Sequence, residues 1–121
     1  MNWTCRKYRI RVPATEDVRF SLWVYRTKAL LIKSVKGDQI EAACRWNRKT
    51  RRISILIAAD NLRYLYLGHE CFHAAFRYHD LNQDKYKGKI APNTEELLAD
   101  IAGFLWSGVH GITRRYGKYW G

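Results

Sequence analysis

The sequence predicts an α+β domain, with a small, mainly antiparallel sheet and two long helices packed on one face of it. Three observations support this prediction: period-two hydrophobic patterns in the first 60 residues, two long helical patterns after them, and a hydrophobic content of 47% over 121 residues. A chain of this size and composition builds one core. We therefore predict a single domain over residues 1–121, with a sheet-rich basic half (1–60), a helical half (61–110) and a basic aromatic tail (111–121).

Four segments of the first half have the pattern of strands. Residues 5–12 alternate apolar Tyr8, Ile10 and Val12 with basic Lys7, Arg9 and Arg11, which is typical of a strand with one wet face. Residues 18–25 alternate in the same way. The alternative there is one long helix from Thr15 to Gly37, which the content of Val, Phe, Trp and Tyr disfavours. Residues 39–46 and 52–57 predict a hairpin around a turn at 47–50.

Three segments predict helices. Thr27 can cap a short helix over residues 28–36 that ends at Gly37. Asp60 or Asn61 can cap a second helix that starts at Leu62 and ends within residues 78–82, before a polar loop over residues 82–93. Asn93 or Thr94 can cap a third helix, whose apolar body to Trp106 predicts that it is buried.

The second helix carries the motif around which the chain is organised, His69-Glu70-x-x-His73. Residues four apart lie on one helix face, so both imidazoles can reach one cation. Glu70 then lies beside the open coordination position, where a water would be bound. The pattern is that of a zinc hydrolase with one Zn²⁺, two histidine ligands, and Glu70 as the general base.

The third ligand has three candidates. Glu96 is favoured, because it shares a helix face with Asp100, and two carboxylates on a buried helix need partners. The metal would be the partner of Glu96. Asp100 would accept a hydrogen bond from the ring N–H of a ligating histidine and so belong to the second shell of the metal. His79 is the alternative third ligand, at the spacing of the metzincin signature, but Phe76 stands where that signature has glycine. Glu95 is the third candidate, although it points about 100° away from Glu96.

The motif helix and the helix after it resemble those of a known group of proteins. His69-Glu70-x-x-His73, followed by Glu96-x-x-Ala99-Asp100, is similar to the gluzincin pattern, and the surrounding residues resemble small zincin-like metallopeptidases of bacteriophages and prophages, and more distantly ImmA/IrrE-type and SprT-type domains. The resemblance covers roughly residues 50–106. It implies a minimal zincin, a peptide or protein substrate, and an edge strand at about residues 54–58 that pairs with that substrate. No motif identifies an oxyanion stabiliser, for which Tyr78, His110 and Tyr116 are unranked candidates.

The charge of the chain suggests a second function. The net charge is +11, of which residues 1–60 carry +9, and five of residues 45–52 are Arg or Lys. Such a surface attracts nucleic acid or an acidic protein. The predicted contacts are at the hairpin tip: Arg48, Lys49, Arg51 and Arg52. The alternative to a peptidase is therefore a non-catalytic zincin-fold binding protein that acts on a nucleic acid or a host nucleoprotein complex, for example a phage inhibitor of a defence system.

The composition also indicates the cellular compartment in which we expect the protein. Three cysteines without a Cys-x-x-Cys pair argue against a disulfide framework and against a cysteine zinc site. No apolar run has the length of a membrane span and no secretory signal is evident, so we expect no membrane partner. We expect a cytoplasmic protein, in a bacterial host cell if the resemblance to phage proteins holds. The sequence gives no oligomeric state.

Overall fold

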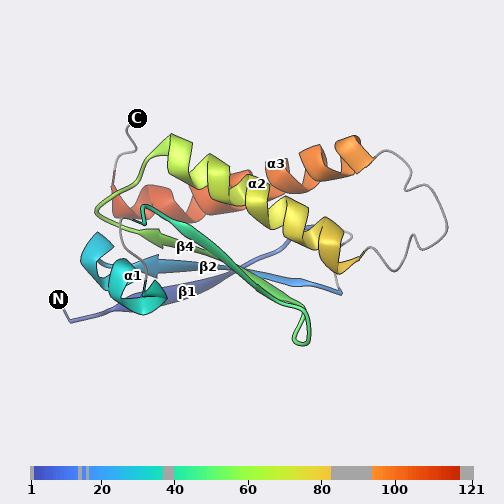
Figure 1. Cartoon of the computed structure of the whole chain (residues 1–121). Helices are drawn as coiled ribbons and strands as arrows, with labels where there is room; N and C mark the ends of the chain where they lie inside the picture. The colour runs from blue at the N-terminus through green and yellow to red at the C-terminus, as the bar shows by residue number, and fades with distance from the viewer. Residues whose placement is uncertain (1, 14, 16, 37–39, 83–93, 118–121) are drawn as a thin grey trace.

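Four strands form one mixed sheet in the order β1-β2-β4-β3 (Figure 1). The computed structural model describes residues 2–13, 15, 17–36, 40–82 and 94–117. Its strands are β1 (Cys5–Ile10), β2 (Arg19–Tyr25), β3 (Ala43–Asn47) and β4 (Arg52–Ala58). β1 pairs with β2, and β3 with β4, in antiparallel fashion, whereas β2 and β4 are parallel neighbours. The predicted α+β class, the strand over residues 18–25 and the hairpin are confirmed.

Three α-helices of the described part of the chain cover the sheet. They are α1 (Lys28–Val35), α2 (Tyr64–Leu81) and α3 (Thr94–Thr113), and a short 3-10 turn, η2 (Arg114–Tyr116), follows α3. The first residues of the predicted tail thus continue α3, and residues 118–121 lie outside the described part. Gly37, the predicted end of the first helix, also lies outside it, and so do residues 83–93, which include most of the predicted loop and the candidate cap Asn93. None of the described helices is long and apolar enough to cross a membrane.

The predicted caps are right for one helix and wrong for another. The Thr27 side chain accepts a hydrogen bond from the Leu30 backbone N–H at 3.2 Å, as expected for the N-cap of α1. In contrast, α2 starts after Arg63, which makes no side-chain cap. Asp60 instead accepts from the Lys28 backbone N–H at 2.8 Å, at the start of α1. The residue predicted to cap α2 therefore stabilises a helix that is distant in sequence.

The sheet separates two apolar layers, because β-strand side chains alternate between faces. Ile53, Ile55 and Ile57 of β4 face the main core under α2 and α3. Leu56 and Ala58 face the other way and pack with Leu31 of α1. The two long helices pack against each other and lie on the same face of the sheet (Figure 1). This arrangement confirms the predicted pair of helices on one face.

Helix α3 is less buried than its apolar composition predicted. Only one stripe is fully buried: Ile101, Leu105, Val109 and Thr113. Phe104 on another face keeps 48% of its surface exposed. The expectation of a largely buried helix is therefore corrected, because α3 is fully buried along one stripe, half-buried beside it and exposed at residues such as Phe104.

Two glycines of α3 offer a matched test of this packing. A Cβ at Gly108 would lie 2.7 Å from Cγ2 of buried Ile10, whereas a Cβ at Gly103 would meet no atom within 4 Å. Both changes to alanine gain roughly 1 kcal/mol of helix propensity. At Gly108 the clash with a stiff β-branched side chain costs about 1–3 kcal/mol. We expect Gly103→Ala to raise the midpoint of thermal unfolding and Gly108→Ala to lower it; a rise for both would contradict the close approach of α3 to β1.

Candidate metal centre

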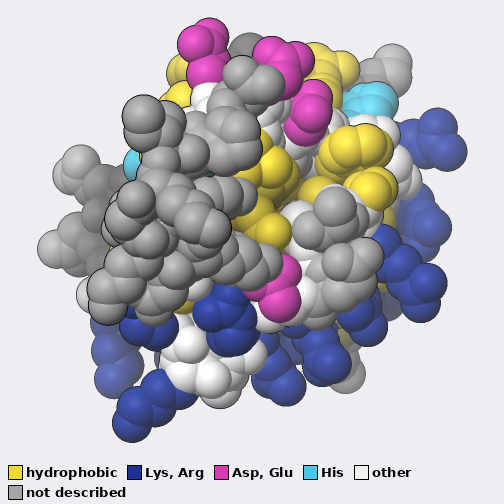
Figure 2. Space-filling view, turned by 90° about the vertical axis from the view of Figure 1, so that its right-hand side faces the viewer, with side chains coloured by type: hydrophobic (Ala, Val, Ile, Leu, Met, Phe, Trp, Pro, Cys, Tyr) yellow, Lys and Arg dark blue, Asp and Glu magenta, His cyan; other side chains and the backbone are white. Residues whose placement is uncertain are grey.

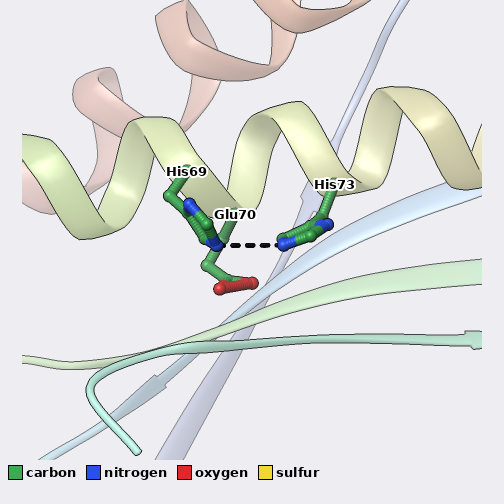
Figure 3. A group of neighbouring side chains, drawn as sticks. All are labelled: His69, Glu70 and His73. Carbon is green, nitrogen blue, oxygen red and sulfur yellow. Dashed lines mark hydrogen bonds between the residues drawn. The ribbon is translucent and has the colours of Figure 1, made fainter.

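His69, Glu70 and His73 project together from α2. One ligand atom from each lies within 4.8 Å of the other two, and in the described part of the chain this is the only such group of three. The two histidine Nε2 atoms are 2.9 Å apart and share a hydrogen bond, with the rings at 81° to each other. Figure 3 shows all three side chains leaving α2 on the side of the strands, with the ribbon of α3 on the opposite side. His69 and His73 thus lie on one face of the helix and point toward each other, as their spacing predicted.

The donor set fits a divalent metal such as zinc. Two nitrogen ligands 2.0–2.1 Å from a tetrahedral zinc lie about 3.3 Å apart. The two Nε2 atoms are slightly closer than this, at 2.9 Å, so a small opening of the pair would admit the ion. Both histidines are exposed and therefore accessible from solvent. The group can hold a metal without any change in the path of α2.

Glu70 differs from its two neighbours by being buried. Its exposed fraction is 7%, whereas His69 and His73 are exposed. Burial raises the pKa of the Glu70 carboxyl, and the nearby His73 and His69 oppose this effect in part. A carboxylate with a raised pKa is a stronger base than one free in water. The geometry thus separates two accessible nitrogens from one sheltered carboxylate.

The group opens onto a hollow that the motif did not reveal. This hollow, of about 420 Å³, lies between α2 and the segment before β3 and is lined by Ile40, Glu41, Ala42, Leu65, Tyr66, His69 and Glu70. Both Glu41 oxygens are already engaged, one by Lys28 at 2.7 Å and one by Asn61 at 2.6 Å. These contacts hold the pKa of the Glu41 carboxyl below its usual range. No motif surrounds Glu41 in the sequence, so sequence reasoning missed it.

The strand that borders the centre is not the one the resemblance implied. β4, which contains residues 54–58, pairs with β2 on one side and β3 on the other. β3 pairs only with β4 among the described strands, so it is an edge strand, and it contacts α2. The expected role as a substrate-pairing edge is therefore wrong for residues 54–56, because the hairpin folds back and places β3 outside them. Ile57 and Ala58 pair with β2 and have no partner in β3.

Two thiols lie close to Glu70. Burial raises the pKa of Cys44 and of Cys71 to about 12, and the charge of Glu70 adds to both shifts. Thiolates are the form that binds soft metals, and these two thiols are protonated at neutral pH. Neither belongs to the group of three ligand atoms within 4.8 Å.

The raised pKa values of Cys44 and Cys71 predict which cysteines are alkylated in the native protein. Burial also raises the pKa of Cys5, but the Lys7 charge and a hydrogen bond with Tyr25 oppose this shift. At pH 8 we therefore expect iodoacetamide to modify half-exposed Cys5 and to spare Cys44 and Cys71, since only thiolates react. Peptide mass mapping before and after addition of guanidinium would show one modified site becoming three. Modification of Cys44 in the folded protein would contradict its protonated state, and modification of Cys71 would contradict its burial as well.

The carboxylates predicted to complete the centre lie elsewhere on the surface. Glu96 and Asp100 are both exposed on α3, and neither belongs to the group of three on α2. They lie about 140° and about 100° around the helix from buried Ile101. The inference that buried carboxylates need partners therefore does not apply to them. Their roles as third ligand and second shell stay predictions from the sequence pattern, as does the weaker candidacy of exposed Glu95.

The other sequence candidates are also placed apart from the group. His79 follows His73 by six residues on a helix that continues to Leu81, so it faces another direction and lies outside the group of three. Among the candidate oxyanion stabilisers, Tyr78 is buried against Phe20. His110 and Tyr116 contact aromatic side chains: His110 stacks on Tyr64 and Trp106, and Tyr116 shares a hydrogen bond with Tyr8.

The basic hairpin residues divide into two kinds. Arg48, Lys49 and Arg52 are exposed, as predicted for surface contacts. Arg51 is half-buried and adopts a left-handed backbone conformation with φ of 54°. Its guanidinium donates to Asp17, to the Leu81 carbonyl at 3.1 Å and to Asn82 at 2.7 Å. Arg51 thus ties the hairpin to the end of α2, a structural role that sequence reasoning missed.

Comparisons with protein-family models, with curated proteins and with solved structures gave no match to this chain. The case for function therefore depends on the group of His69, Glu70 and His73 and on its surroundings.

Proposed function

We propose that this protein is a zinc-dependent peptidase. His69 and His73 would hold one Zn²⁺, and Glu70 would act as general base. The observation that carries the proposal is the convergence of two accessible imidazole nitrogens and one sheltered carboxylate beside an open hollow. This combination of ligands and base is the one that metal-assisted hydrolysis requires.

The residues of the centre divide the chemistry between them. A bound zinc would supply a water of lowered pKa and polarise the carbonyl of the substrate. Glu70 accepts a proton from the attacking water and passes it to the nitrogen of the leaving amine. Its sheltered position beside the two imidazole nitrogens supports this role, because a general base must lie within reach of the water that it activates.

An extended peptide is the substrate class that the surroundings support. β3 has one unpaired edge among the described strands and contacts the helix that carries the centre. An exposed edge can pair with an extended chain through main-chain hydrogen bonds. A peptide paired with β3 would lie next to the hollow beside Glu70, so the support for a peptide substrate comes from the position of this edge.

The finer assignment follows the sequence pattern. We propose a gluzincin-like centre, of the kind found in phage and prophage zincins, in which Glu96 becomes the third ligand and Asp100 supports a ligating histidine once metal is bound. His79 is the weaker alternative. In this structure both carboxylates are exposed on α3, so the assignment depends on the pattern alone.

The experiment uses full-length protein with one equivalent of zinc and an unstructured substrate, fluorescein-labelled casein. We expect a steady release of labelled fragments, stopped by 1,10-phenanthroline and restored by added zinc. Zinc-loaded protein that releases no fragments would overturn the peptidase and favour the alternative, a zincin-fold protein that binds without cleaving. Cleavage that survives chelation would show a contaminating protease and would also overturn the proposal.

A further inference from the structure

The face of the sheet opposite α2 and α3 is only partly covered. α1 packs over the end of the sheet that contains Tyr25, Leu56 and Ala58. The other end is open and has a hollow of about 250 Å³, lined by Lys7, Tyr8, Arg9, Arg19, Ser21, Trp23, Arg52 and Ser54. This hollow lies on the other side of the sheet from the metal centre, because strand residues alternate between faces.

Strand pairing concentrates positive charge on this open face. One row across the four strands runs Arg9, Ser21, Ser54 and Arg45. The next row pairs Arg19 directly with Arg52. With Lys7, these side chains form what we call the basic sheet face: Lys7, Arg9, Arg19, Arg45 and Arg52. None of the four strands contains an Asp or Glu.

Three cations of this face have no acidic partner among the described residues. Arg9, Arg19 and Arg52 are exposed, and none forms an ion pair with a described residue. Like charges on directly paired residues, as at Arg19 and Arg52, destabilise a sheet. Figure 2 shows Lys and Arg side chains gathered on the lower, sheet side of the molecule, whereas most of the Asp and Glu side chains visible in this view lie at the top, on the side of the helices. The face is therefore complementary to a polyanion.

The hollow also contains an aromatic ring and two hydroxyl groups. The Trp23 ring is partly exposed, with the Lys7 ammonium 3.9 Å from its centroid, and its Nε1–H donates to Ser21 at 3.2 Å. Ser21 and Ser54 share a hydrogen bond of 2.8 Å between their hydroxyls. A base that stacks on Trp23 would take the place of the Lys7 ammonium over the ring, and this ammonium would then be free to meet a phosphate.

We infer that the basic sheet face binds single-stranded nucleic acid. The cations spread over three strand spacings, roughly 14 Å, so they match a chain of phosphates better than one isolated phosphate. A single strand can bring a base down to Trp23, whereas a duplex keeps its bases stacked inside. This site is distinct from the exposed hairpin-tip cations Arg48 and Lys49, and it does not depend on the metal centre.

The test measures fluorescence anisotropy of a fluorescein-labelled 20-residue oligothymidine with the metal-free, full-length protein. We expect a dissociation constant in the micromolar range at 50 mM salt, and a loss of roughly 10²-fold or more at 200 mM salt. Arg19→Gln with Arg52→Gln should weaken binding at least about 10-fold, since two phosphate contacts are lost. The conservative pair Arg19→Lys and Arg52→Lys should restore most of it.

Matched controls locate the site. Arg114→Gln with Arg115→Gln removes the same charge from exposed residues of η2 and should change affinity by less than about 3-fold. Equal losses in both double variants would show a diffuse charge effect and overturn the site, and a loss confined to Arg48→Gln with Lys49→Gln would move it to the hairpin tip. Tighter binding of a 20-base-pair duplex, equal binding of poly-glutamate, or no binding at 50 mM salt would each overturn the inference.

Discussion

Replacement of His69 or His73 by alanine should abolish tight zinc binding. Each change removes one of the two converging Nε2 atoms and leaves a single imidazole beside Glu70. The expected loss of affinity exceeds the roughly 10–100-fold that removal of an outer-shell partner costs. Both histidines are exposed on a helix where alanine is favoured, so the variants should stay folded. Competition with a zinc-sensitive dye measures the affinity, and circular dichroism checks the fold.

Glu96→Gln tests the proposed third ligand. The proposed centre recruits Glu96 once metal is bound, so we expect zinc affinity to fall by at least about 10-fold. A change of less than about 3-fold would show that Glu96, which is exposed on α3 and outside the group of three, is not a ligand. Retention of full affinity in His69→Ala and His73→Ala together would place the metal elsewhere.

Glu70→Gln should separate binding from catalysis. The amide keeps the shape of the side chain but cannot accept the proton of the attacking water. We expect zinc to remain bound and hydrolysis of labelled casein to fall by about 10²–10⁴-fold, the usual contribution of a positioned general base. The comparison requires equal zinc content in both proteins, measured on the samples used for the assay.

The matched control for Glu70→Gln is Glu41→Gln, which alters the other carboxylate that lines the hollow. Glu41 already bonds Lys28 and Asn61 and lies outside the metal group, so hydrolysis should stay within about 3-fold of the original. If Glu70→Gln cleaves as fast as the unmodified protein, Glu70 is not the base. If it loses zinc, Glu70 is a ligand.

The fold could be predicted well because its signals are local. Alternation in β1 and β2, the Thr27 cap and the spacing of His69 and His73 each depend on neighbours within a few residues. The period of a strand or helix fixes which side chains share a face, so the convergence of the two histidines followed from their spacing alone.

The remaining features depend on contacts between distant segments. The parallel pairing of β2 with β4 makes β3 the edge strand, and no local pattern indicates this order. Asp60 looked like a cap for α2 but serves α1, and Arg51 looked like a surface cation but holds the end of α2. The face of α3 that packs was likewise set by its partners, which left Glu96 and Asp100 exposed.

X-ray absorption at the zinc edge, on protein loaded with one equivalent and dialysed, identifies the atoms that hold the metal. We expect one retained zinc with two imidazole nitrogens at 2.0–2.1 Å, and loss of this imidazole signal in His69→Ala and His73→Ala. A sulfur shell at about 2.3 Å would place the ion on cysteine instead. No retained zinc, or a spectrum without imidazole scattering, would rule out a metal centre at His69 and His73.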